Sequence, residues 1–242
     1  MQVVPDSLPP PTGDAKRSYV REMFTAIAPH YDFLNHALSL NIDRRWRRGA
    51  VQRLGWESAP HGTYLDLCAG TMDLAADLAR RPSFGGRVVG ADFVVPMLKL
   101  GKAKADRLSA VGADALVLPF RDAQFDGCTV GFGVRNLANI SSGLREIARV
   151  LKPGARFVVL EFATPTSWPA RPLYLTYFKH VLPAVGRLVS KHGSAYSYLP
   201  HSVLDFPEPP AFSAQMEEAG FRDVARKPLT LGIAMLYVGT RR

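Results

Sequence analysis

The chain is poor in cysteine and lacks a long apolar run, and each of these two features argues against one class of protein. Only two cysteines, Cys68 and Cys128, occur among 242 residues, and both fall where buried strands are expected to end. A disulfide framework is therefore excluded, and reduced core thiols in a reducing compartment are expected. No run of about 18 uninterrupted apolar residues is present, which argues against a membrane-spanning helix. The N-terminal MQVVPDSLPPPTGDA has neither a basic region nor an apolar core, so it does not predict a secretory signal.

The chain does contain enough apolar material for one core. Hydrophobic residues make up 47% of the sequence, which suits one large α/β core and leaves little for a second. We therefore expect a disordered tail over residues 1–15 and a single domain over 16–242. The formal net charge of +9 favours an anionic partner, such as nucleic acid, an anionic membrane surface or an acidic substrate. Charge alone does not choose among these three.

Helical spacing of apolar residues predicts three helices near the N-terminus. They cover residues 16–28, 31–38 and a segment that begins at Asp43, and Pro29 stops the first of them. The third helix would bury one face and present a basic run on the other, formed by Arg44, Arg45, Arg47 and Arg48. We interpret residues 16–58 as a helical lid that folds over a pocket.

From Thr63 onward strands and helices alternate, which is typical of an α/β fold with a parallel sheet and covering helices. The predicted strands are 64–67, 87–91, 125–131 and 156–161, and the predicted helices between them are 72–80, 95–108 and 141–151. A helix near 210–219 leads into strands 221–226 and 233–239, which are expected to form a hairpin at one edge. Residues 163–208 are too many for an ordinary connection, so we expect this insertion to carry substrate specificity.

The stretch TYLDLCAGTMDLAADLA, residues 63–79, predicts a strand, a tight loop and a helix of the kind that holds a nucleotide-like cofactor. Only Gly70 is a glycine where a GxGxG loop would have three, because Cys68 and Met72 occupy the other two positions. A pyrophosphate on the helix N-terminus needs close backbone approach and is hard to seat here. S-adenosylmethionine has no phosphate, and its amino-acid part can be held by Asp66 and the loop backbone.

Acidic residues stand at successive predicted strand ends, as this cofactor would require. Asp92 in VVGADF can accept from both ribose hydroxyls, and Phe93 can pack on the adenine. GADALVLPF ends a further short strand, the third along the chain, with Asp114 and Ala115. There Asp114 can accept from the adenine amino group while the Ala115 amide meets a ring nitrogen. Any one of these acids alone is equally compatible with a solvated strand end. Together with Asp66 they form a more specific pattern.

Three longer stretches carry a resemblance to a known family: YDFLNHALSLNIDRRWR (31–47), TVGFGVRNLANISSGLREIARVLKPGARFVVLEF (129–162) and YFKHVLPAVGRLVSKHGSAYSYLPHSV (177–203). With them the chain resembles the menaquinone and ubiquinone biosynthesis methyltransferases, which C-methylate the ring of prenylated quinols. The resemblance implies the Rossmann-like sheet of class I methyltransferases, mostly parallel with a C-terminal antiparallel strand. It also implies S-adenosylmethionine as cofactor and a prenylated quinol as substrate.

The exact substrate stays open at this point. Demethylmenaquinol is the first hypothesis, and the methoxy-benzoquinol of the ubiquinone pathway or a phylloquinol is the alternative. A noncatalytic scaffold of a quinone-biosynthesis assembly is the alternative from another class.

Carried across residue by residue, the family's cofactor site falls on Thr71, Asp92, Asp114, Ala115 and Gly131. The family commonly has Asn at position 114, and aspartate keeps the acceptor. It commonly has Ser at position 131, where Gly131 leaves only backbone contact. The family's GGTGD loop is AGTMD here, so Met72 replaces a glycine. We expect Met72 to begin the helix with a helical φ and to point its thioether away from the ligand or along its apolar parts.

Three side chains are candidates for the chemistry that the resemblance implies. A quinol carbon becomes nucleophilic when the neighbouring phenol loses its proton, and Arg135, just past the fourth strand, could stabilise the phenolate. Tyr31 could hydrogen-bond the quinol oxygen or close on the cofactor carboxylate. His180 is the histidine candidate for a general base. The competing interpretations are a surface arginine, a packed aromatic and a structural histidine.

The insertion 163–208 mixes aromatic residues with lysine and arginine. An apolar patch rimmed by basic residues suits a polyprenyl tail drawn from an anionic membrane surface, although the same aromatics could be ordinary core. We therefore expect a cytoplasmic protein with peripheral contact to the inner face of the membrane. No nucleic acid is expected, because no binding motif or stacking stripe accompanies the charge. A homodimer is left open.

Overall fold

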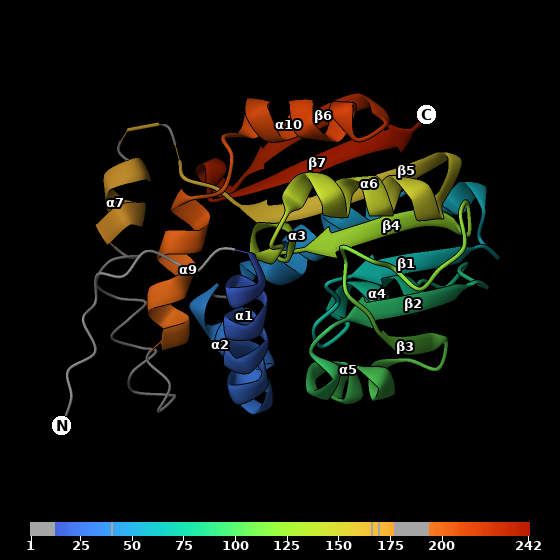
Figure 1. Cartoon of the computed structure of the whole chain (residues 1–242), viewed down its shortest axis with the longest axis horizontal. Coiled ribbons are helices and arrows are strands. Elements are labelled where there is room, and N and C mark those ends of the chain that lie inside the picture. Colours follow the sequence, from blue (N-terminus) through green and yellow to red (C-terminus); the bar gives the residue numbers. More distant parts are fainter. Residues whose placement is uncertain (1–12, 40, 166, 169, 177–193) are drawn as a thin grey trace.

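The computed structural model describes residues 13–39, 41–165, 167–168, 170–176 and 194–242, which surround one seven-stranded sheet (Figure 1). The strands are β1 (Thr63–Leu67), β2 (Arg87–Asp92), β3 (Leu108–Gly112), β4 (Phe125–Gly131), β5 (Leu151–Phe162), β6 (Phe221–Leu229) and β7 (Ala234–Arg241). Their order across the sheet is β3-β2-β1-β4-β5-β7-β6. The first five strands are parallel, and β7 is antiparallel to both neighbours. The predicted sheet and its edge hairpin are confirmed.

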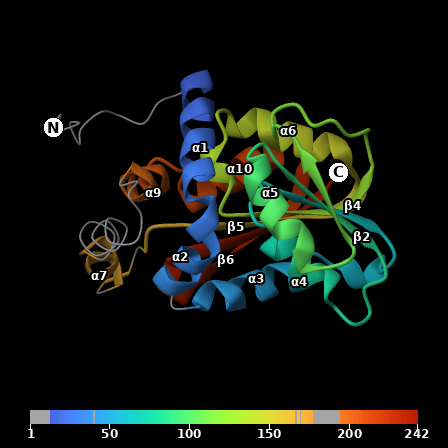
Figure 2. The ribbon, with the colours of Figure 1, turned by 90° about the horizontal axis from the view of Figure 1, so that it is seen from below.

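Helices cover both faces of the sheet, which is why its central strands are apolar along their length (Figure 2). One face carries α3 (Ile42–Arg53), α4 (Asp73–Ala79) and α5 (Val95–Gly101), and the other carries α6 (Ile140–Val150) and α10 (Pro209–Glu218). In β5, Phe157 and Val159 pack against the second group, whereas Val158 and Leu160 pack against the first. This alternation follows from the two-residue period of a strand.

Two predicted boundaries are wrong. The helix predicted over 95–108 ends at Gly101, and the chain enters the sheet at Leu108 in parallel register with β2. Gly101 is a poor helix former and ends the α-helix. The pairing of β3 with β2 then requires an extended chain at Leu108. Strand β5 starts earlier than predicted because Leu151 already pairs with Phe125.

Three helices lie across the carboxyl ends of the parallel strands (Figure 1): α1 (Gly13–Ile27), α2 (Tyr31–Leu38) and α9 (Ser194–Leu204). Val20 and Met23 of α1 share a small apolar cluster with Tyr198 of α9. By contrast, α3 buries Trp46 in the main core, so within 16–58 only the first two helices lie over the strand ends. The short α7 (Ala170–Thr176) lies farther out.

The arginines of α3 differ from the predicted uniform basic face. Arg44, Arg45 and Arg48 are exposed, whereas Arg47 is only 9% exposed and points inward. Within the described part of the chain, no helix has the length and apolarity needed to cross a membrane.

Candidate cofactor site

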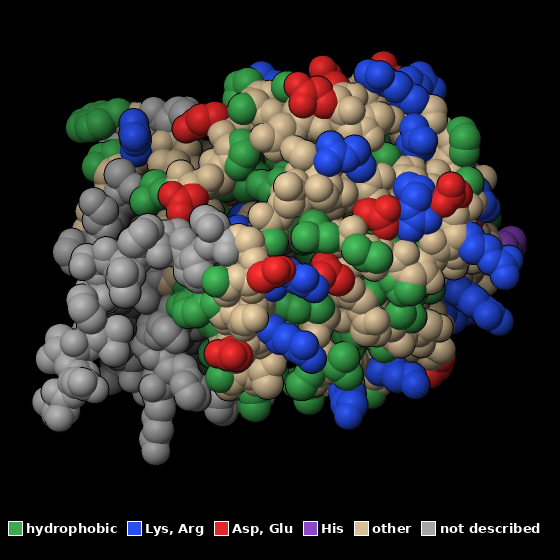
Figure 3. All heavy atoms as spheres, in the orientation of Figure 1, with side chains coloured by type: hydrophobic (Ala, Val, Ile, Leu, Met, Phe, Trp, Pro, Cys, Tyr) green, Lys and Arg blue, Asp and Glu red, His purple; other side chains and the backbone are tan. Residues whose placement is uncertain are grey.

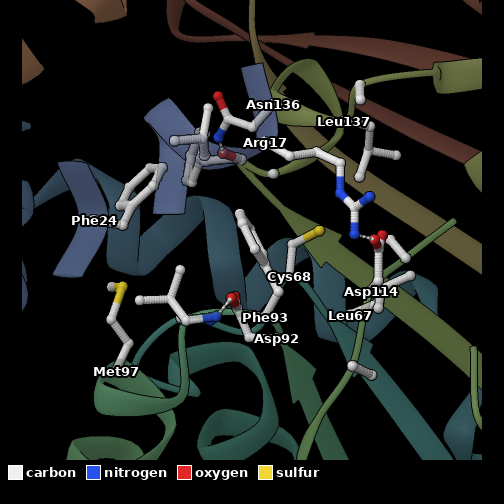
Figure 4. A pocket seen from close by; sticks show the side chains of 18 of the residues that line it. Arg17, Phe24, Leu67, Cys68, Asp92, Phe93, Met97, Asp114, Asn136 and Leu137 are labelled. Carbon is white, nitrogen blue, oxygen red and sulfur yellow. Dashed lines mark hydrogen bonds and ion pairs between the residues drawn. The ribbon is translucent and has the colours of Figure 1, made fainter. Parts of the chain in front are cut away.

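A pocket with about 710 Å³ of empty space, part of it open to solvent, lies at the carboxyl ends of β1 to β4 beneath α1 (Figure 4). Its lining includes the predicted residues Tyr31, Gly70, Asp92, Phe93, Asp114, Ala115 and Gly131. A smaller pocket of about 360 Å³ adjoins it around Gly70 and contains Asp66 and Thr71. The fold thus brings every predicted cofactor residue to two adjoining pockets.

The Asp92 carboxylate joins the end of β2 to the loop after β1. Its Oδ2 accepts from the Gly70 N–H at 2.8 Å, and its Oδ1 accepts from the Val94 N–H at 2.8 Å. Burial raises the pKa of Asp92, and these backbone donors lower it again in part. A carboxylate has about four acceptor positions, so each oxygen can still accept from a ligand hydroxyl.

At the opposite wall of the larger pocket, Asp114 is already engaged by the protein. Its Oδ1 accepts from the Leu116 N–H at 2.9 Å, and its Oδ2 forms an ion pair with Arg17 of α1 (Figure 4). The sequence offered no signal for this partner, because Arg17 is one of several charged residues along α1. The acid expected near the adenine therefore also attaches the helix that covers the pocket.

Met72 departs from the helical conformation expected for it. Its φ is +61°, in the left-handed region, because the loop turns sharply before α4 begins. The thioether is fully buried in the core and lines neither of the two pockets. Two glycines make room for it: a Cβ at Gly90 would lie 2.4 Å from Met72 Cε, and one at Gly101 would lie 2.8 Å from its Cβ.

Asp66 is held by protein donors at the floor of the smaller pocket. It accepts from the Thr129 hydroxyl at 3.0 Å and from the Ala75 N–H at 3.0 Å, and so fixes the start of α4 to the sheet. Burial raises the pKa of Asp66 to about 7, against the lowering effect of these donors. Near neutral pH this carboxyl is therefore partly protonated.

A polar network attaches α2 to the same loop. The Thr71 hydroxyl donates to Asp32 of α2, and Lys104 Nζ contacts Asp32 Oδ2 at 2.7 Å and Asp73 Oδ1 at 2.5 Å. Arg47 also pairs with Asp73. Burial alone would raise the pKa of Asp73, but the Arg47 and Lys104 charges outweigh it and hold that pKa below its usual value.

Arg135 follows β4 and is buried behind the larger pocket rather than lining it. Its Nη1 pairs with Glu161 Oε1 at 2.6 Å and donates to the Phe132 carbonyl, while its Nε donates to Ser202 Oγ of α9 at 3.3 Å. Among the described residues Nη2 has no hydrogen-bond partner. The guanidinium is thus rigidly held, with one end uncommitted.

Asn136, the next residue, does line the larger pocket and accepts from the Tyr198 hydroxyl at 3.1 Å. The sequence analysis missed it, although a polar residue directly after a strand end is a usable signal. Tyr31 lies against Gly70 between the two pockets, and burial raises the pKa of its hydroxyl. His180 lies outside the described residues.

The arrangement defines the class first. Solved structures with the same fold include the [4+2]-cyclase SpnF, with a TM-score of 0.66 at 15% identity over 97% of this chain and 98% of that one. A SAM-dependent methyltransferase of Thermotoga maritima gives a TM-score of 0.63 at 15% identity over 91% and 99%. At such identities the likeness concerns the fold alone, which is that of the class I methyltransferases.

Sequence relatives define the family. Residues 12–241 match the ubiE/COQ5 methyltransferase family, and the chain belongs to it. The demethylmenaquinone methyltransferase of Deinococcus radiodurans is 47% identical over 96% of this chain and 98% of its own length, and that of Thermus thermophilus is 48% identical over 90% and 100%. The ubiquinone/menaquinone biosynthesis C-methyltransferase UbiE of Geobacter sulfurreducens is 45% identical over 93% and 90%. The chain is therefore a SAM-dependent C-methyltransferase of quinone biosynthesis, as the resemblance implied.

Proposed function

We propose that this protein methylates the ring carbon of demethylmenaquinol. Two of the relatives above, from Deinococcus and Thermus, are named for demethylmenaquinone, at 47% and 48% identity. The Geobacter relative is named for both quinones, so the methoxy-benzoquinol of the ubiquinone pathway is the second candidate. The observation that carries the catalytic assignment is the pocket at the strand ends, where Asp92 is held by loop amides with acceptor capacity to spare.

The residues present fit S-adenosylmethionine. Asp92 would accept from the ribose hydroxyls, and Phe93 would cover the adenine. Asp114, which is also paired with Arg17, would face the adenine amino group. The methionyl group would enter the smaller, more polar pocket beside Thr71. When bound, the cofactor supplies an electrophilic methyl group on its sulfonium.

We assign Arg135 to the charge that develops on the quinol oxygen, which requires the quinol to reach past the lining of the larger pocket, behind which Arg135 is buried. Glu161 and Ser202 fix two of its nitrogens, so Nη2 is left to donate to a developing phenolate. The full positive charge is not available, since Glu161 balances it at 2.6 Å. Directional hydrogen bonding rather than net charge is then the main contribution.

Tyr31 would act as a donor and not as a base. Burial raises the pKa of its hydroxyl, so the group keeps its proton at neutral pH. From its place beside Gly70 it can donate to the quinol or to the cofactor. A base has to come from elsewhere, and His180 stays a candidate.

The outer end of the molecule, around α7 and α9, supports contact with a membrane surface. Trp168, Arg171 and Leu204 are exposed there, with Trp168 at 85%. Figure 3 shows hydrophobic side chains beside a basic one at this end. An exposed tryptophan at the same end as a basic side chain suits the interface of an anionic bilayer, where a prenylated quinol resides.

The quinone profile of a strain lacking this protein tests the substrate. Loss of function should cause demethylmenaquinone to accumulate and menaquinone to disappear, and the gene in trans should reverse both. Accumulation of an unmethylated methoxy-benzoquinone instead would support the second candidate. An unchanged profile would contradict both.

A further inference from the structure

Arg47 of α3 lies at the end of the site that the adenosine residues do not reach. It lines the smaller pocket together with Gly70, Thr71 and Asp73, whereas Asp92 and Asp114 line the larger one. Its side chain is 11% exposed, so the guanidinium is almost enclosed by protein. A buried arginine at the floor of a polar pocket requires a partner for each of its nitrogens.

The described residues supply partners for only one of these nitrogens. Nη1 of Arg47 pairs with Asp73 Oδ2 and lies 3.3 Å from Asp43 Oδ2. Within the described part of the chain, Nε and Nη2 have no hydrogen-bond partner, and neither is among the buried unpaired atoms that are sealed from solvent. Both therefore keep accessible surface, and the side chain that carries them lines the smaller pocket.

The charges around this pocket suit a zwitterion. Two cations, Arg47 and Lys104, are paired with three carboxylates, Asp32, Asp43 and Asp73, and His36 contacts Asp43 at 2.9 Å. A fourth carboxyl group, that of Asp66, lines the same pocket. A simple anion would meet the surplus of carboxylates. An amino-acid group brings an ammonium for the carboxylates and a carboxylate for the free side of the guanidinium.

We propose that Arg47 binds the α-carboxylate of the methionyl group of S-adenosylmethionine through Nε and Nη2. The planar fork of a guanidinium matches the two oxygens of a carboxylate. The proposal rests on the proposed function, because it takes the cofactor to occupy the two adjoining pockets. It assigns α3, a core helix that precedes the cofactor loop, a direct part in cofactor binding.

The test compares two ligands that differ only at this end. S-adenosylhomocysteine carries the amino-acid group, and 5′-methylthioadenosine retains the adenosine and thioether without it. Arg47→Gln should raise the dissociation constant of S-adenosylhomocysteine about 10–100-fold in calorimetry, as expected for loss of a bidentate charged contact. The dissociation constant of methylthioadenosine should change less than about twofold. Arg48→Gln, on the exposed face of the same helix, should change neither. The affinity of Arg47→Lys for S-adenosylhomocysteine should lie between those of the parent and Arg47→Gln.

Equal loss of both ligands in Arg47→Gln would overturn the proposal and assign Arg47 a structural role through Asp73. Unchanged binding of both would also overturn it. Thermal unfolding of each variant separates misfolding from lost contact. If the parent binds neither ligand, the cofactor assignment itself fails, and with it the proposed function.

Discussion

Replacing Asp92 tests how the adenosine part of the cofactor is held. In the proposed complex its two oxygens accept from the two ribose hydroxyls, and hydrogen bonds to a charged acceptor contribute about 1.5–3 kcal/mol each. Asp92→Ala should therefore weaken the binding of S-adenosylhomocysteine by about 3–6 kcal/mol, or raise its dissociation constant about 10²–10⁴-fold. The same change also removes the acceptor of the Gly70 and Val94 amides.

That second effect makes a simple loss of affinity ambiguous, because the loop could relax. Leaving a buried N–H without an acceptor costs about 1–3 kcal/mol, which would appear as a lower unfolding temperature. The cleaner assay compares S-adenosylhomocysteine with its 2′-deoxy analogue. The parent should prefer the full ribose by about 10–100-fold, the equivalent of one such bond, and Asp92→Ala should have lost that preference.

Asp106→Ala, at an exposed acid before β3, is the matched control and should keep the full preference. If Asp92→Ala still discriminates between the two ligands as the parent does, the carboxylate does not contact the ribose. Asp92 would then be only a clamp on the loop.

Three further changes have definite expected results. Met72→Gly should keep S-adenosylhomocysteine affinity within about threefold but lower the free energy of unfolding. Losing a buried methionine costs about 2–5 kcal/mol, and relief of the left-handed conformation returns only about 1–2 kcal/mol. A large loss of affinity would mean that the thioether contacts the ligand. Burial raises the pKa of Asp66 from 3.8 to about 7, so the folded state favours the protonated carboxyl. The stability of the parent relative to Asp66→Asn should therefore decrease as the pH rises from about 4 to about 7. A difference in unfolding free energy that does not change with pH in denaturant titrations would contradict the raised pKa. Arg135→Ala should bind S-adenosylhomocysteine nearly as the parent does but methylate about 10²–10³-fold more slowly in single turnover, with Arg135→Lys also impaired; a parental rate would remove Arg135 from the chemistry.

The sequence predicted the sheet and the position of the site because both depend on local patterns. Alternating apolar segments specify strands and helices, and ligands in such sheets bind beyond the carboxyl ends. Asp66, Asp92 and Asp114 could therefore be placed near one another before any coordinates. Gly70 followed from the same loop, since its φ of +51° suits glycine.

The partners of these residues could not be predicted, because they come from segments that are distant in sequence. Helical spacing does place Arg47 on the apolar face of α3 and Arg48 off it, but it does not identify Asp73 as the partner of Arg47. The conformation of Met72 was mistaken for a related reason. A methionine is unfavourable in the left-handed region, and only tertiary packing against Gly90 and Gly101 accounts for its presence there.

The most direct test of the central claim follows the methyl group itself. The purified protein would be given S-adenosylmethionine with a deuterated methyl group and a short-tailed demethylmenaquinol under reducing conditions. The account predicts that the label appears on the ring carbon of the product, as established by mass spectrometry and nuclear magnetic resonance. Label on a quinol oxygen, or no transfer by a protein that binds both ligands, would contradict it.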